Sequence, residues 1–171
     1  MGTRGLTKVI DETGRIKVAQ YGQWDHYPSG QGLNMLSIIS KYGMLDRIKG
    51  NLRKVHFLSQ EEVESMFKGY TNADGWMTME QGQAFELIYP ALSRNTCTDI
   101  LNVIAWSTGY TLGLHDESEF ENDETFCEGV FTLDFQTNEF ISNCGVEVRF
   151  PLDNLPTADV YLNTFRQEAV A

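Results

Sequence analysis

Strand-forming sequence lies at the two ends of this chain, and helix-forming sequence lies between them. Near the N-terminus, two β-branched and partly alternating runs flank a turn that contains Gly14, which predicts a hairpin. Near the C-terminus, three similar runs with short connections predict an antiparallel meander. We therefore expect a single α+β domain, residues 1–171, whose antiparallel sheet joins the hairpin to the meander. The expected strands are residues 6–10, 16–21, 129–135, 139–143 and 146–151.

The middle of the chain shows helical periodicity and helix boundary signals. Gly43 and Pro90 are stop signals, and Ser59 with Glu62 forms a capping box. We expect the middle helices to pack on one face of the sheet, and a terminal helix to begin near Pro156. The basic residues of the second helix are expected to form a solvated face. The expected middle helices are residues 33–41, 44–55, 59–67, 78–89 and 98–106.

One segment, residues 70–81, resembles the helix-loop-helix of EF-hand proteins. Asn72 and Gly75 fall on the loop pattern of that family. Tyr70, however, stands where the family places its first Asp ligand, and Gln81 stands where it places the bidentate Glu. We therefore expect an Asx turn followed by a glycine, without calcium binding.

The composition is that of a globular protein, because 42% of the residues are hydrophobic and 12% are aromatic. The cysteines Cys97, Cys127 and Cys144 are odd in number and widely spaced. This disfavours a disulfide framework and indicates a reducing cytoplasm. No apolar run approaches the length of a membrane span. We expect a soluble cytoplasmic protein without a metal or cofactor; the pattern predicts no particular oligomeric state.

Charge is distributed unevenly along the chain. Residues 1–58 contain nine Lys and Arg against four Asp and Glu, whereas residues 59–171 contain four against twenty. The densest acidic run contains no cation, so its field repels nucleic acid and attracts a basic partner surface. The alternative is a solvated loop that only aids solubility. The candidate binding residues in this run are Asp116, Glu117, Glu119, Glu121, Asp123 and Glu124, with Glu128 just beyond them.

A second candidate site is the loop of residues 20–32, which combines aromatic residues with Gly and Pro. Its candidate binding residues are Trp24, Asp25 and Tyr27. We expect both rings to be partly buried, either as a plug at the edge of the core or as part of a ligand pocket. If Trp24 is the core plug, its replacement by alanine costs about 2–4 kcal/mol. Arg4 is a third candidate, either as a clamp for a carboxylate or phosphate or as a surface charge.

The sequence contains none of the common catalytic signatures. There is no Gly-x-Ser-x-Gly elbow, no phosphate-binding loop, no His-Glu-x-x-His and no Cys-x-x-Cys. The adjacent pair Asp25 and His26 is a poor acid-base pair, because neighbouring side chains point apart in an extended backbone. Enzymatic activity is therefore uncertain, and a non-catalytic role is favoured.

The N-terminal thirty residues resemble small bacteriophage and prophage proteins. The resemblance rests on Thr3-Arg4-Gly5, Gln20-Tyr21 and the loop Trp24-Asp25-His26-Tyr27-Pro28-Ser29-Gly30. It implies a phage setting, in the cytoplasm of a bacterial host, and no particular mechanism. We expect an accessory protein that binds and inhibits a host protein with a basic surface, for example an anti-CRISPR-like inhibitor of a nucleic-acid enzyme. The alternative is a small-molecule binding protein or hydrolase with its pocket at residues 20–32.

Overall fold

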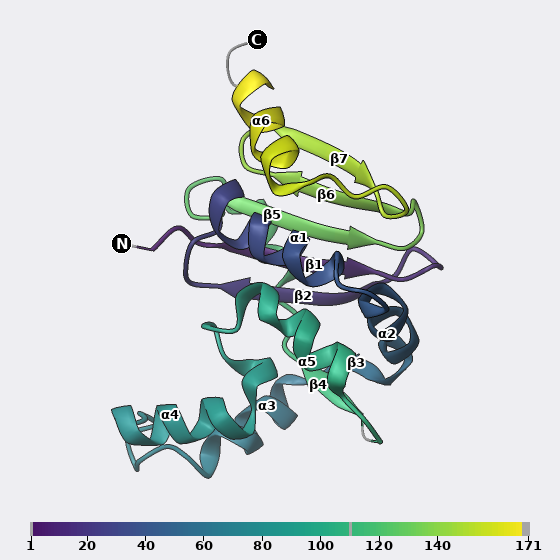
Figure 1. The fold of residues 1–171 in the computed structure, drawn as a ribbon. Coiled ribbons are helices and arrows are strands. Elements are labelled where there is room, and N and C mark those ends of the chain that lie inside the picture. The colour runs from purple at the N-terminus through teal and green to yellow at the C-terminus, as the bar shows by residue number, and fades with distance from the viewer. Residues whose placement is uncertain (1, 110, 169–171) are drawn as a thin grey trace.

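A computed structural model describes residues 2–109 and 111–168 and contains one five-stranded sheet (Figure 1). The strand order is β2-β1-β5-β6-β7, so the N-terminal hairpin and the C-terminal meander share one sheet, as predicted. The strands are β1 Gly5–Ile10, β2 Ile16–Gly22, β5 Gly129–Asp134, β6 Glu139–Asn143 and β7 Glu147–Pro151.

The sheet is mixed, whereas the sequence predicted antiparallel pairing throughout. Strands β1 and β5 run parallel, with Gly5 opposite Gly129 and Ile10 opposite Asp134. The other three pairings are antiparallel. A parallel neighbour requires the chain to return to the same end of the sheet, and residues 11–128, which include the antiparallel strand β2, make that return here. No local pattern in either strand indicates this direction, because it depends on where the crossover returns to the sheet.

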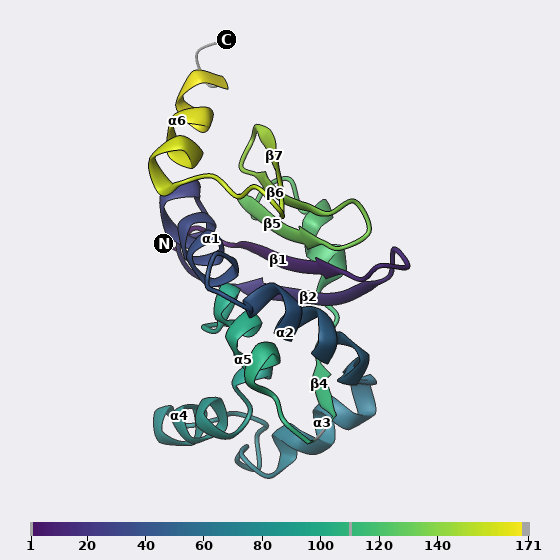
Figure 2. The ribbon, with the colours of Figure 1, turned by 45° about the vertical axis from the view of Figure 1, so that its right-hand side comes forward.

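Three helices pack together against one face of the sheet and beside the β2 edge (Figures 1 and 2). They are α1 Leu33–Ile39, α2 Met44–Asn51 and α5 Ile100–Trp106, close to the predicted ranges. Their apolar residues form one core with Val9, Val18, Phe131 and Leu133 of the sheet. The terminal helix α6 Ala158–Glu168 adds the buried Tyr161, whose hydroxyl lies 2.6 Å from Ser142 Oγ.

Helices α3 Gln60–Lys68 and α4 Met79–Ile88 lie beyond the β2 edge and do not cover the sheet as predicted (Figures 1 and 2). Both begin with a capping box. They hold each other through aromatic contacts, for example Phe67 stacked on Phe85 with ring centroids 4.6 Å apart. None of the nine residues of α3, all of them described, is fully buried. These two helices therefore form a hairpin with its own small aromatic core.

The loop between α3 and α4 has the predicted turn. Asn72 Oδ1 accepts hydrogen bonds from the backbone N–H groups of Asp74 and Trp76, at 3.0 and 2.9 Å. Gly75 has a φ of 83°, a left-handed conformation that glycine adopts at little cost. The Asx turn followed by glycine is thus confirmed.

Two short strands escape prediction from sequence. Strand β3 Val55–Phe57 pairs in parallel with β4 Leu112–Leu114 as a separate sheet. Each strand has three residues, too few to show an alternating pattern. A short η2 turn, Leu52–Lys54, also separates α2 from β3, so the predicted helix 44–55 ends early as an α-helix.

The basic face of α2 is partly occupied by contacts to the end of α5. Asn51 Nδ2 donates hydrogen bonds to the carbonyl oxygens of Ile104 and Ala105, at 2.9 and 3.2 Å. Lys54 Nζ donates to the carbonyl oxygen of Ser107. Carbonyls at the end of a helix lack intrahelical donors, so α2 and the η2 turn that follows it supply donors at the end of α5. The prediction of a solvated basic face therefore holds only for part of it.

Candidate binding surfaces

Residues 116–128, here called the acidic segment, fold against the sheet face opposite α1 (Figure 2). The segment contains the 3-10 helix η5, Ser118–Asn122. Phe120 packs edge-on against Tyr21 of β2, with ring centroids 4.8 Å apart. Glu121 forms an ion pair with Lys8 of β1. The acidic segment is therefore an ordered layer on the second face of the sheet.

Local hydrogen bonds hold the backbone of the acidic segment. Asp116 Oδ1 accepts from the N–H of Ser118 at 3.0 Å, and Asp123 Oδ1 accepts from the N–H groups of Thr125 and Phe126 at 3.1 Å. Asx turns of this kind explain why acids stand at these positions in an irregular segment. Two candidate acids, Asp116 and Asp123, are thus partly used to shape the segment.

The remaining acids differ in how their charge is compensated. Glu121 forms an ion pair with Lys8, whereas Glu117 contacts the ring of His115, which cancels its charge only when that ring is protonated. Glu119 and Glu124 are exposed, and neither carboxylate has a cationic partner among the described residues. Asp116, Asp123 and Glu128 also lack an ion-pair partner among the described residues, but Asp116 and Asp123 accept hydrogen bonds from the segment's own backbone. Glu119 and Glu124 are therefore exposed, uncompensated acids that do not shape the backbone of the segment.

Arg4 lies at the end of the acidic segment. Its guanidinium carbon is 4.1 Å from the ring centroid of Phe126, a cation-π contact. The backbone carbonyl oxygen of Arg4 accepts from the N–H of Glu128 at 2.8 Å. Arg4 therefore holds this end of the segment against the start of β1.

Trp24 and Tyr27, in the loop of residues 20–32, are about half exposed, at 48% and 40%. Trp24 Nε1 donates to Asn95 Oδ1 at 2.9 Å, and the Tyr27 hydroxyl donates to Asp25 Oδ1 at 3.3 Å. Asp25 has a φ of 59°, and its backbone carbonyl accepts from the N–H groups of Tyr27 and Gln31. Both rings are thus among the exposed large hydrophobic side chains, in contrast to the predicted partial burial, and Asp25 organises the turn.

The residue of this loop that plugs the core is His26. It is 0% exposed, and its ring lies over Gly5 and Gly22, where an added Cβ would come within 2.5 and 2.0 Å of it. His26 Nδ1 is 3.0 Å from the Trp24 carbonyl oxygen, which can only accept, so Nδ1 carries the proton. Burial lowers the pKa of His26 to about 4. The sequence predicted that Trp24 would be the plug. The space beside His26 exists because Gly5 and Gly22 lie opposite each other on adjacent strands, and this pairing is apparent only in the folded structure.

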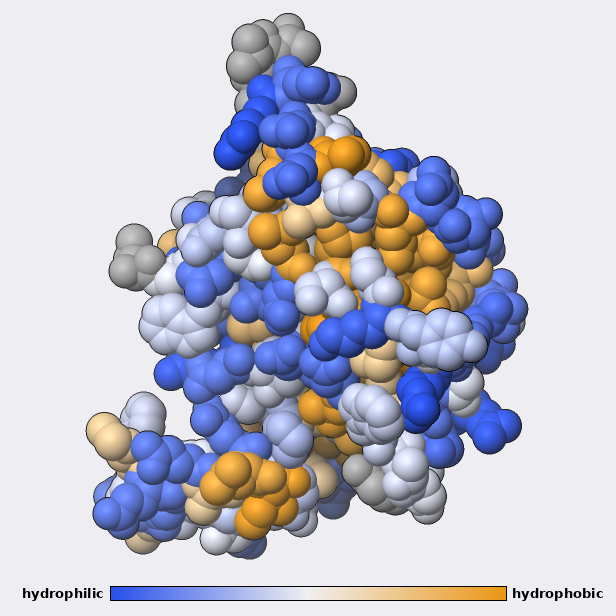
Figure 3. Space-filling model, viewed as in Figure 1, coloured by the Kyte–Doolittle hydropathy of each residue, from blue (hydrophilic) through white to orange (hydrophobic). Residues whose placement is uncertain are grey.

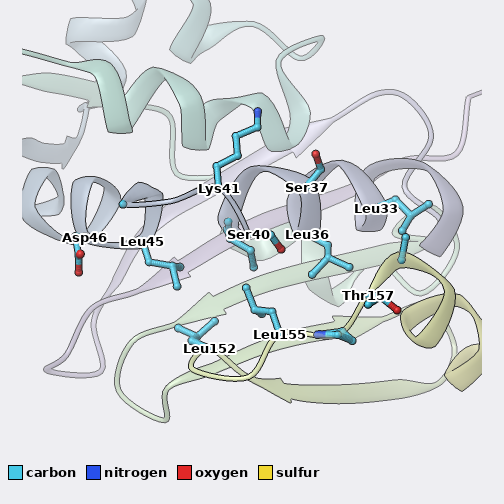
Figure 4. Close-up of a pocket in the computed structure, with 14 residues that line it drawn as sticks. Leu33, Leu36, Ser37, Ser40, Lys41, Leu45, Asp46, Leu152, Leu155 and Thr157 are labelled. Atoms are coloured by element: carbon cyan, nitrogen blue, oxygen red, sulfur yellow. The ribbon is translucent and has the colours of Figure 1, made fainter.

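A large apolar hollow, the leucine groove, lies between the α1–α2 region and residues 152–158 (Figure 4). Its volume is about 870 Å³. Leu36, Leu45, Leu152 and Leu155 point toward one another in the groove, whereas Lys41 points away. The same region shows a broad hydrophobic surface in Figure 3. Trp24, Asp25 and Tyr27 do not line this groove.

A smaller hollow, the α3 groove, lies between the outer edge of β2, helix α3 and the start of the acidic segment. Its volume is about 220 Å³. Sequence reasoning missed it, because its walls come from four separate parts of the chain. The only local sign of a groove is that α3 has an apolar side. The sequence does not identify what covers that side. The lining residues are Gln20, Tyr21, Val63, Phe67, Leu92, Arg94, His115 and Glu117.

The structure brings the candidate residues to neighbouring places at one end of β1. The N–H of His26 donates to the Thr3 carbonyl, and the N–H of Glu128 donates to the Arg4 carbonyl. The loop of residues 20–32 therefore contacts Thr3, and the acidic segment contacts the next residue, Arg4. Among the described residues, no three His, Cys, Asp or Glu side chains are placed to hold a metal ion, and no helix is long and apolar enough to cross a bilayer.

Comparisons with protein-family models, curated proteins and solved structures found no match. The geometry of the surfaces is therefore the basis for any functional assignment.

Proposed function

We propose that this protein is a non-catalytic binding protein that docks through the acidic segment on a basic surface of a partner protein. The observation that carries the proposal is the ordered, exposed segment with uncompensated charge at Glu119 and Glu124. Clustered like charges repel one another, and that repulsion opposes compact folding unless counterions or a partner relieve it. A segment already held in one conformation also loses less entropy on binding than a flexible loop does.

The resemblance of the N-terminal thirty residues to phage proteins suggests which partner to seek. A host nucleic-acid enzyme has a basic groove that binds phosphates, and an acidic protein surface can occupy that groove. The proposed effect is inhibition of such an enzyme, in the manner of an anti-CRISPR protein. This role needs no direct contact with nucleic acid, membrane or cofactor.

Charge removal tests the proposal. A host protein captured from a bacterial lysate is purified and titrated with wild type and with the double variant Glu119→Gln, Glu124→Gln. We expect the variant to bind more weakly, and wild-type binding to weaken between about 0.01 M and about 0.15 M salt, since screening acts on exposed charges. The matched control is Glu80→Gln, Asp159→Asn, which removes two exposed charges from other elements. Equal affinity of both double variants, or affinity indifferent to salt, would contradict the proposal.

The leucine groove supports a second candidate function, binding of an apolar small molecule. A cavity of about 870 Å³ with leucine walls is of the size that small-molecule sites have. A metabolite found by native mass spectrometry of the purified protein, and lost in Leu45→Lys but not in the exposed-site control Leu87→Lys, would favour this function.

A further inference from the structure

We propose that one face of α2 and α5, here called the aromatic-basic face, binds single-stranded nucleic acid. Such binding goes beyond the proposed function, which needs no contact with nucleic acid. The sequence predicted a solvated surface here, and no aromatic residue lies among the cations of residues 44–55. In the fold, Trp106 at the end of α5 lies beside those cations. The residues of the face are Lys41, Tyr42, Arg47, Lys54 and Trp106.

Two large aromatic side chains of this face are open to a ligand. Trp106 is 59% exposed, and Tyr42 is fully exposed in the turn that precedes α2. The guanidinium carbon of Arg47 lies 4.4 Å from the ring centroid of Trp106, a cation-π contact. Nucleic-acid bases stack on aromatic rings and on guanidinium planes. The rings and the guanidinium of this face therefore suit unpaired bases.

The aromatic-basic face is positively charged, although the whole chain is acidic. Residues 41–54 contain five Lys and Arg and a single acid, Asp46, and residues 100–115 contain no Asp or Glu. Asp46 lines the leucine groove, and Figure 4 shows Lys41 pointing away from that groove. The cations of the face that form no ion pair among the described residues are Lys41, Arg47 and Lys54. Their charges complement the phosphate groups of a nucleic-acid strand.

The cations and the indole ring lie along one side of α2. Asn51 and Lys54 both donate to carbonyl oxygens at the end of α5, and Arg47, four residues before Asn51, contacts Trp106 there. The eight residues of α2 span about 12 Å, so the face is an extended track. A single strand exposes both its phosphates and its bases along such a track, whereas a duplex keeps its bases stacked inside. The arrangement therefore favours a single strand over a duplex.

The acidic segment does not cancel this local attraction. It lies on the sheet face opposite α1, whereas α2 follows directly after α1 (Figure 2). At physiological ionic strength, charges are screened over about 8 Å, so a ligand on the aromatic-basic face meets chiefly the charges of that face. The net charge still slows the approach of an anion from a distance. Binding therefore depends on stacking as well as on charge.

An oligonucleotide titration tests the proposal on the free protein. The probe is a fluorescently labelled oligodeoxythymidylate of about ten nucleotides, followed by anisotropy at about 0.02 M salt. A duplex of the same length and polyglutamate, an anionic chain without bases, are the controls. We expect saturable binding of the single strand and at least about tenfold weaker binding of both controls. No saturable binding of the single strand would overturn the proposal, as would equal binding of polyglutamate, which would identify an acidic peptide as the ligand.

Matched variants locate the binding on this face. Trp106→Ala removes the stacking ring, and Trp76→Ala makes the same change at a residue that is 74% exposed in the loop between α3 and α4. We expect Trp106→Ala to weaken oligonucleotide binding about tenfold and Trp76→Ala to leave it unchanged. Arg47→Gln should weaken binding and its salt dependence, whereas Lys68→Gln, at an exposed site on α3, should change neither. Equal effects of the two tryptophan variants, or of the two cation variants, would overturn the proposal.

The acidic-segment variant separates this site from the proposed function. Glu119→Gln, Glu124→Gln should bind the oligonucleotide at least as tightly as wild type, because it removes negative charge from another surface. Weaker oligonucleotide binding by that variant would overturn the assignment to the aromatic-basic face. The proposed function is tested by the captured partner protein, so either of the two can fail while the other stands.

Discussion

At the scale of single residues, burial changes the chemistry of side chains that look reactive in the sequence. Burial raises the pKa of Cys127 to about 11 and that of Cys144 to about 12, so both are thiols at neutral pH. The same cause keeps His26 neutral. These groups are suited to packing, and none of them supplies the thiolate or the near-neutral base that a hydrolase needs.

The buried His26 predicts how stability depends on pH. Its pKa is about 4 in the folded protein and about 6.5 in the unfolded chain, so the unfolded state binds the proton first as pH falls. The free energy of unfolding that is linked to His26 is therefore unaffected above pH 6.5. It decreases between pH 6.5 and 4, by up to about 3 kcal/mol. Urea unfolding at several pH values measures this decrease.

Two histidine variants separate this effect from the titration of the many carboxylates. His26→Phe removes the titrating group and keeps a ring in the cavity, so it should lose the decrease between pH 6.5 and 4. His56→Phe, at an exposed position, should retain it. An identical pH profile in both variants would show that His26 is not the group responsible.

At the scale of elements, the fold connects helices through donors and acceptors as well as through apolar contacts. Helix α5 ends with carbonyl groups that accept from Asn51 of α2, and the acidic segment is joined to β2 by a backbone hydrogen bond and to β1 by the ion pair of Glu121 with Lys8. The α3–α4 hairpin is different, because its aromatic contacts are internal and none of the described residues of α3 is fully buried. This weaker attachment leaves the α3 groove open at the β2 edge.

The contact between α2 and α5 predicts a stability effect at Asn51. Replacing Asn51 with alanine removes the donors of two half-buried hydrogen bonds to α5, so we expect a loss of about 1–3 kcal/mol in the free energy of unfolding. Lys49→Ala, on the same helix, breaks an exposed ion pair with Glu12 and a distant cation-π contact with Phe135, and should cost less than about 1 kcal/mol. Equal losses in chemical denaturation would mean that Asn51 does not serve α5.

At the scale of the whole molecule, a net charge of −11 acts on folding as well as on binding. The cations are concentrated in residues 1–58, and several are already engaged, as in the pairs Lys8–Glu121 and Lys49–Glu12. Much of the acidic charge in the rest of the chain is therefore exposed and uncompensated. Self-repulsion of this kind destabilises the compact state.

Salt should accordingly stabilise the free protein. We expect the melting temperature to rise between about 0.01 M and about 0.15 M sodium chloride, because screening reduces repulsion between exposed charges more than it weakens partly buried pairs. An uncharged solute at matched osmolarity is the control. A melting temperature that falls with salt would indicate that attractive ion pairs dominate the electrostatics of the fold.

Local sequence was enough to predict the strands at both ends, the middle helices, the capping box at Ser59 and the Asx turn at Asn72. These depend on periodicity and on contacts between residues a few positions apart, which a sequence displays directly. It also located the acidic segment, because charge is a property of composition.

Contacts between residues far apart in the chain depend on tertiary packing. The parallel pairing of β1 with β5, the glycine-lined cavity of His26 and the contacts of Asn51 all join segments far apart in the chain. The α3 groove has the same origin, since Gln20 and Val63 become neighbours only when α3 lies beside β2. Local patterns carry no record of such contacts, because their partners are chosen by the packing of the whole domain.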